Sequence, residues 1–165
     1  MSPDLIAEFK HLDTRADDMI ARVRGMSEDI QQAPVGKSFS PIKVLDHMAV
    51  LEESYVKYTQ NAIPAKLKGR KGKPNFFYGL VLKSMRKPAG KTTPTPKMFM
   101  PHGGQSIDES EKLWKERRAR LVEFISPFGD DDAAMKHPFM GYLSPRDIFI
   151  LLEKHQDYHD ARLPN

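Results

Sequence analysis

Residues 153–159 read EKHQDYH and place two histidines, His155 and His159, four residues apart at the end of an apolar run. On an α-helix, residues at positions i and i+4 lie one above the other on the same face. The apolar residues before the pair have matching spacing, so both imidazoles should face inward, toward other helices. The sequence therefore predicts a helix over residues 144–162 that carries a histidine pair on its buried face.

This pair has two interpretations. Two neutral ring nitrogens on one helical face can hold a divalent metal ion, leaving other positions to a third protein ligand and to water or substrate. Alternatively, the two histidines are polar residues at a fraying helix end, satisfied by water or a carboxylate. Spacing alone does not separate the two, because one such pair among six histidines in 165 residues is not unusual. A third inward-facing histidine would favour the metal site.

Three further segments show the apolar spacing of three and four residues that is typical of amphipathic helices. They are residues 2–25, 40–62 and 106–128. Ser-Pro opens the first, the second and the C-terminal helix, which suits a capping residue followed by the first helical residue, and a capping box opens the third. We expect the connections 26–39 and 129–143 to be loops, and no segment shows convincing strand alternation.

His47 lies in the middle of the apolar stripe of the predicted helix 40–62. A single histidine in such a place is more often a core residue hydrogen-bonded to a neighbour than a metal ligand. Because the last helix also sends histidines inward, His47 becomes the candidate third ligand. Spacing does not decide whether Glu52 and Glu53 belong to the site or to the surface, and we expect Arg118 to lie on a solvated face.

Residues 63–105 form a long connection of unusual composition. They hold ten Lys or Arg and no Asp or Glu, so the remainder of a chain with net charge +4 carries −6. One interpretation is a crossover that spans the bundle and is kept soluble by lysines; the other is a site for nucleic acid, phosphate or an acidic cofactor. An apolar group between Phe76 and Met85 predicts a short helix, whose aromatic rings either stack on bases or dock on the bundle.

These elements predict an all-α fold, a four-helix bundle in a single domain over residues 1–165. The long crossover 63–105 lets the second and third helices run parallel, and the short connections make the flanking pairs antiparallel, which gives an up-down-down-up order. The chain has no cysteine, which excludes disulfides, thiolate zinc sites and a cysteine nucleophile. Because no apolar run reaches the roughly 18 residues that span a bilayer and no signal peptide is evident, we expect a cytoplasmic protein with no membrane partner.

The combination of motifs resembles the DinB/YfiT-like superfamily of metal-dependent bundles. The features that carry the resemblance are His47 early in the second helix, and His137-Pro138, a glycine, Leu-Ser, an apolar helix and His-x3-His toward the C-terminus. The resemblance implies a four-helix bundle, often a homodimer, that binds a divalent transition metal, most often nickel or zinc. Residue by residue, it implies His47, His155 and His159 as the metal ligands, with water completing an open site.

Two functional hypotheses of different classes follow. Characterised relatives imply a metal-dependent enzyme acting on a small molecule. It would be a thiol-dependent S-transferase, using a low-molecular-weight thiol such as bacillithiol or mycothiol, or a hydrolase; a maleylpyruvate isomerase is also among those relatives. Under this hypothesis nucleic acid is not an expected partner. The alternative is a non-catalytic binding module that uses the basic 64–101 segment to bind an acidic partner or nucleic acid.

Overall fold

The computed structural model describes residues 1–36, 38–61, 67, 69–86 and 94–164. In chain order its elements are α1 (Pro3–Arg24), α2 (Glu28–Gln32), α3 (Pro41–Gln60), β1 (Lys73–Pro74), α5 (Phe76–Met85), the 3-10 helix η1 (Lys97–Phe99), α6 (Ile107–Ile125), β2 (Met135–His137), β3 (Gly141–Leu143) and α7 (Pro145–Asp160). Four of the ten basic residues in the predicted crossover lie outside the described residues.

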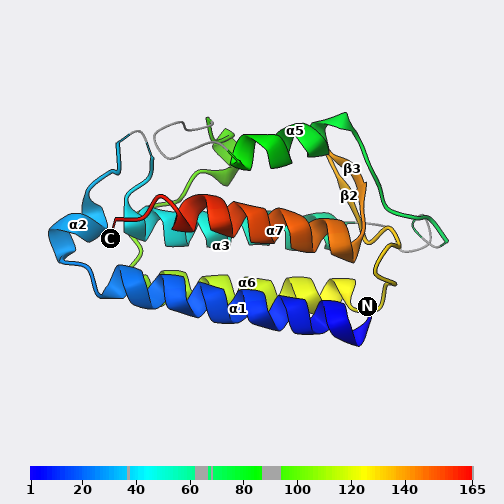
Figure 1. Ribbon diagram of the computed structural model, residues 1–165, viewed down its shortest axis with the longest axis horizontal. Helices are drawn as coiled ribbons and strands as arrows, with labels where there is room; N and C mark the ends of the chain where they lie inside the picture. Colours follow the sequence, from blue (N-terminus) through cyan, green and yellow to red (C-terminus); the bar gives the residue numbers. More distant parts are fainter. Residues whose placement is uncertain (37, 62–66, 68, 87–93, 165) are drawn as a thin grey trace.

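The long helices α1, α3, α6 and α7 form the predicted four-helix bundle. In Figure 1, α1 and α7 run in one direction while α3 and α6 run in the other, so the order is up-down-down-up. The parallel helices α3 and α6 pack along each other, which the long segment between them permits. Within the described ranges, no helix combines the length and the apolar character that crossing a bilayer requires.

Capping side chains explain where most of these helices begin. The Ser2 hydroxyl accepts a hydrogen bond from the Leu5 N–H at 3.2 Å and so satisfies one N–H that has no partner within the helix. Ser106 and Ser144 open α6 and α7 with complete capping boxes. Ser40 holds the same position before α3, but its side chain makes no capping hydrogen bond. The start of α3 therefore depends on Pro41, whose fixed φ suits the first helical position.

The structure corrects the prediction that the chain has no strands. Three short antiparallel strands form a sheet in the order β1-β3-β2, and two of them lie in the connection 129–143 that was predicted to be a loop. Tyr142 of β3 pairs with Lys136 on one side and with Lys73 on the other. Strands of two or three residues are too short to show an alternating pattern. The connection 26–39 likewise contains the short helix α2, which was not predicted.

Gly141 is what allows β1 to approach the hairpin of β2 and β3. Its φ is 88°, a conformation that side-chain-bearing residues rarely adopt. A Cβ at this position would lie 2.8 Å from the carbonyl oxygen of Lys73. Any other residue would therefore push β1 away from the sheet.

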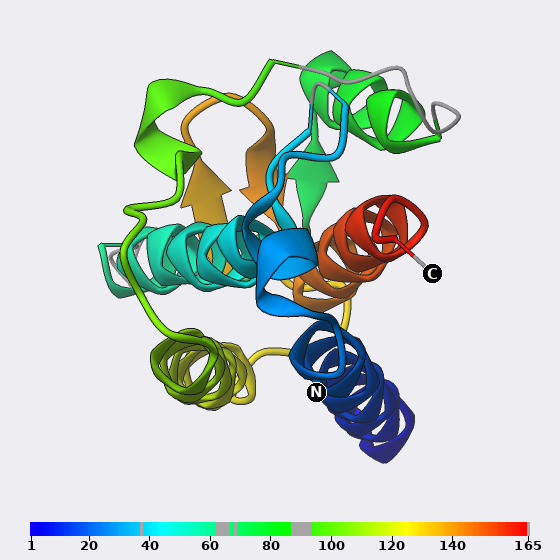
Figure 2. The same cartoon turned by 90° about the vertical axis from the view of Figure 1, so that its left-hand side faces the viewer.

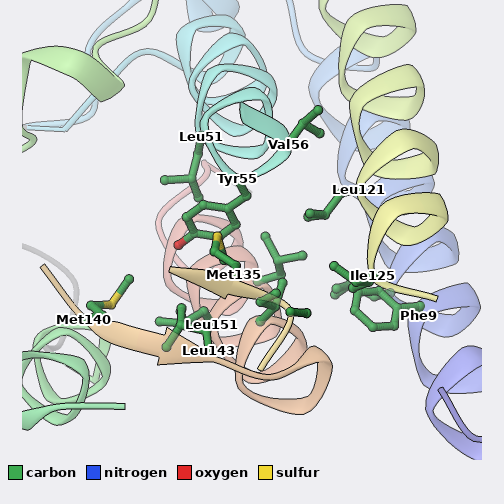
Figure 3. Packing of buried hydrophobic residues seen from close by; sticks show 14 of the residues in the cluster. Phe9, Leu51, Tyr55, Val56, Leu121, Ile125, Met135, Met140, Leu143 and Leu151 are labelled. Carbon is green, nitrogen blue, oxygen red and sulfur yellow. The ribbon is translucent and has the colours of Figure 1, made fainter. Parts of the chain in front are cut away.

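Figure 2 shows the arrangement of the elements in layers. Helices α3 and α7 lie in the middle, α1 and α6 cover one side, and the sheet and α5 cover the other. Figure 3 shows the apolar cluster that joins these layers, with Phe9 of α1, Ile125 of α6, Leu151 of α7 and the strand residues Met135 and Leu143 all contributing. This packing fixes the sheet against the bundle and leaves the rest of the α3–α7 face available to form a site.

A buried charged network on the opposite face of α3 was not predicted. Glu52 is fully buried and accepts hydrogen bonds from Trp114 Nε1 at 2.5 Å and from Arg118 Nε at 2.6 Å. Arg118 is only 3 % exposed, so the expectation that it lies on a solvated face was wrong. The buried face of α6 therefore includes Arg118 in addition to the apolar residues. It can do so because the carboxylate of Glu52 compensates the charge of the arginine. Glu53, by contrast, is partly exposed and pairs with Lys57 and Arg117.

Candidate metal centre

The structure brings together the three histidines singled out in the sequence. His47 projects from α3, and His155 and His159 project from α7. Their side chains are 3 %, 9 % and 7 % exposed, respectively, so all three are buried. The Nε2 atom of His155 lies 3.2 Å from that of His47 and 3.0 Å from that of His159. Three imidazoles therefore converge on one point between the two helices.

The spacing of these nitrogens suits a shared metal ion. A metal–imidazole bond is about 2.0–2.1 Å long, so two nitrogens on one tetrahedral ion lie about 3.3 Å apart and those on an octahedral edge about 2.9 Å. The observed separations of 3.0 and 3.2 Å fall between these values. One ligand atom from each of the three residues lies within 4.8 Å of the others. Imidazole ligands suit zinc, copper, iron and nickel.

Hydrogen bonding sets the tautomer of His47. Its Nδ1 lies 2.6 Å from the carbonyl oxygen of Phe99, the last residue of the 3-10 helix η1. Since a carbonyl only accepts, Nδ1 carries the proton and Nε2 presents a lone pair toward the other two histidines. The crossover segment is held in place by Asp46, whose carboxylate accepts a hydrogen bond from the Gly103 N–H at 2.9 Å. The residue next to His47 thus anchors the segment that orients its ring.

All three imidazoles are neutral in the folded protein. Burial lowers the pKa of His155 well below its ordinary value, and the two neighbouring imidazoles lower it further. Burial and the proximity of His47 do the same to the pKa of His159. Burial also lowers the pKa of His47, although the Phe99 carbonyl opposes this effect. Neutral imidazole is the form that binds metal.

A cavity of about 600 Å³ opens beside the three histidines. This volume is in the range of small-molecule sites. Its walls come from α3, α5, α7, the segment 94–100 and the β2–β3 hairpin. Most of its lining is apolar and includes Phe39, Leu51, Phe77, Val81, Met85, Phe99, Phe139 and Met140. Among the described residues, no Lys, Arg, Asp or Glu lines the cavity.

None of the described basic residues of the crossover lines this cavity. Lys71 pairs with Asp132 at 2.6 Å, and the Arg70 guanidinium lies 5.2 Å from the centre of the Tyr142 ring. Neither side chain belongs to the cavity wall. The described part of the crossover instead supplies apolar lining from α5 and from segment 94–100, so its main contribution to the site is not its charge.

Sequence reasoning missed several groups of this site. The Phe99 carbonyl could not be found from spacing, because its position depends on how the crossover folds back. Tyr55 and Tyr158 also line the cavity; both lie on helices that already carried candidate ligands. His137, which the sequence had already singled out in its His137-Pro138 motif, lines the cavity as well, whereas His102 is exposed and outside it.

Comparison with known proteins agrees with this architecture. The sequence profile of the DinB superfamily matches residues 11–163. The chain is also similar in structure to TT2238, described as a four-helix bundle protein, with a TM-score of 0.55 and 17 % sequence identity over 93 % of this chain and 94 % of that one. At that identity the likeness concerns the fold alone. No curated protein has a significant match to the sequence.

Proposed function

The chain belongs to the DinB superfamily, and we propose that it is a divalent-metal-dependent enzyme acting on a small molecule, either as a thiol-dependent S-transferase or as a hydrolase. We propose His47, His155 and His159 as the metal ligands. One observation carries this proposal: three buried, neutral imidazoles converge at 3.0 and 3.2 Å beside a cavity, with no carboxylate in the group.

The three proposed metal ligands determine what chemistry the centre would supply. Three neutral ligands leave the charge of a divalent cation uncompensated, and such a cation would lower the pKa of an adjacent water or thiol toward neutrality. The protein's own contributions are orientation and exclusion of solvent. The Phe99 carbonyl holds the His47 ring in one tautomer, and the apolar walls contributed by Leu51 and Met140 shield a bound substrate from water.

The first test is the metal content of the untagged protein beside that of His155→Ala. We expect about one equivalent of nickel or zinc in the wild type and none in the variant, because two imidazoles hold such ions far more weakly than three. His11→Ala is the matched control, since His11 is an exposed histidine on α1. Absence of metal from the wild type, even after incubation with nickel, zinc or manganese, would overturn the proposal.

The second test separates catalysis from binding. The loaded wild type, His155→Ala and His11→Ala are assayed with thiol plus electrophile, and separately with ester substrates. Turnover that is lost only in His155→Ala supports the enzyme. A salt-sensitive interaction with an acidic partner that persists in His155→Ala, without any turnover, would support the binding module instead.

A further inference from the structure

His137 is a buried histidine of the same cavity that the metal proposal leaves unused. It ends β2, is 4 % exposed and lines the cavity. The rings of Tyr55 and Tyr58 lie edge to face with it, at centroid distances of 6.0 and 5.1 Å. It comes from the β2–β3 hairpin and not from α3 or α7, the helices that carry the three proposed ligands.

Backbone hydrogen bonds determine where His137 carries its proton. Its Nδ1 accepts from the N–H groups of Phe139 and Met140, each at 3.2 Å. A ring nitrogen that accepts bears no proton, so the proton of the neutral ring is on Nε2. Burial lowers the pKa of His137 to about 4, which keeps the ring neutral near pH 7. No described residue accepts a hydrogen bond from its Nε2–H.

Tyr55 supplies a second donor to the same cavity. Figure 3 shows its hydroxyl directed away from Leu121 and Ile125 of α6, and the residue lines the cavity. Burial raises the pKa of the Tyr55 phenol well above its usual range, so the hydroxyl keeps its proton. No described side chain or backbone group bonds to it. The cavity therefore presents two donors from different elements within an apolar wall.

We propose that the Nε2–H of His137 and the hydroxyl of Tyr55 form a subsite that holds the carbonyl oxygen of an uncharged, largely apolar substrate. The proposal rests on the proposed function in that it takes this cavity as the substrate site. The chemistry selects a carbonyl because the two groups donate and an oxygen with two lone pairs can accept from both. It selects an uncharged carbonyl group because the described wall offers no charged side chain to compensate a buried ion, and the charge of the proposed metal ion would act at the three histidines.

His137→Asn separates this role from the part His137 plays in the hairpin. The Oδ1 atom of asparagine takes the place of Nδ1 and still accepts from the Phe139 and Met140 N–H groups, while the Nε2–H donor is lost. Tyr55→Phe is the second variant. It removes only a hydroxyl without a described partner, so it keeps the fold even if His137→Asn is unstable.

The experiment measures the binding of acetophenone and of ethylbenzene to the chelator-treated full chain by calorimetry. The two probes differ by a carbonyl in place of a methylene. We expect the wild type to prefer acetophenone. Each variant should lower the affinity for acetophenone by about three- to tenfold, the effect of one hydrogen bond, and leave that for ethylbenzene unchanged.

Three results would overturn the proposal. The first is a wild type without a preference for acetophenone, and the second is a preference that both variants retain. The third is an equal loss of affinity for the two probes in each variant, which would mean that the substitutions alter the cavity as a whole and do not remove a hydrogen bond to the carbonyl. Metal titration of the same proteins keeps the two proposals apart. His137→Asn should still take up one equivalent, because the metal proposal does not use His137.

Discussion

Helix α3 carries two buried polar clusters that differ in how their polar atoms are satisfied. On the α6 side, both carboxylate oxygens of Glu52 accept hydrogen bonds and Arg118 donates from all three of its nitrogens, to Glu52 and to Asp13. On the α7 side, the Nε2 atoms of three histidines face one another, and the Nδ1 of His155 has no partner among the described residues.

The difference is what we expect if the Glu52 cluster supports the fold and the histidine cluster is the proposed metal site. Buried charges normally persist only where each is paired and hydrogen-bonded, and the Glu52 cluster meets this condition while joining α1, α3 and α6. In the histidine cluster the Nε2 atoms contact one another at 3.0 and 3.2 Å, and because His47 carries its proton on Nδ1, the N–H donors are fewer than the nitrogens that meet there. We expect such an arrangement to contribute little to the fold on its own, and the proposed metal ion would complete it. The predictions below test this contrast.

The largest expected effect is on the Glu52 cluster. Arg118→Ala leaves the fully buried Glu52 carboxylate without its cation, and we expect the free energy of unfolding to fall by about 3–5 kcal/mol. Urea unfolding measures this change. Arg120→Ala is the control, because Arg120 is exposed on the same helix and its loss should change stability by less than about 0.5 kcal/mol. If both variants lowered the free energy of unfolding by the same amount, the Glu52 cluster would have no special role in stability.

The next effect is specific to the histidine cluster. Nickel or zinc at about 100 to 1,000 times its dissociation constant should raise the free energy of unfolding by about 3–4 kcal/mol, since the unfolded chain has no assembled site. Thermal or urea unfolding with and without metal measures the gain. His159→Ala should abolish it and His11→Ala should not. A gain that survives in His159→Ala would place the metal elsewhere.

The two clusters also show what sequence could predict. The inward position of His47, His155 and His159 followed from helical spacing, because a period near 3.6 residues places residues four apart on one face. Their selection as one ligand set came from the resemblance to the DinB/YfiT-like superfamily. The same reasoning failed for Arg118, since a pattern of apolar residues cannot show that a charged residue is buried beside a partner 66 positions away. The bundle order followed from connection lengths alone. What periodicity and connection lengths could not show was which residues far apart in the sequence pair with each other in the fold.

The cavity walls were the least predictable part for the same reason. The hairpin that carries His137 consists of three-residue strands, which are too short for a periodic signal. The Phe99 carbonyl belongs to the backbone and has no residue-type signature. The His137-Pro138 motif and the apolar group between Phe76 and Met85 were visible beforehand, and the apolar group does form the predicted helix α5. The helices that carry the three histidines could therefore be predicted, whereas the hairpin and the crossover segment that line the cavity could not.

A smaller effect is expected from pH in the metal-free protein. Burial lowers the pKa of His137 from 6.5 to about 4, so between these values the unfolded chain binds protons that the folded protein does not. Stability is therefore full above pH 6.5 and falls as the pH decreases toward 4. His137 alone should account for a loss of about 2 kcal/mol between pH 7 and pH 5.

Urea unfolding at pH 7 and pH 5 measures this loss. The wild type should lose more stability than His137→Asn, by about the amount assigned to His137. The rings that face His137, Tyr55 and Tyr58, have raised pKa values and do not titrate in this window. Identical losses in the two proteins would mean that His137 is not held neutral by the fold.

The smallest expected effect gives the sharpest contrast between the clusters. In the metal-free protein, His155→Leu replaces a buried imidazole that has an unpartnered Nδ1 by an apolar side chain of similar size. No charge loses a partner, so the free energy of unfolding should stay within about 1 kcal/mol of wild type. The same variant should no longer be stabilised by nickel or zinc. The position would then be dispensable to the fold and essential to the metal site, the reverse of Arg118. If His155→Leu instead lost about 3 kcal/mol or more without metal, the histidine cluster would be as structural as the Glu52 cluster.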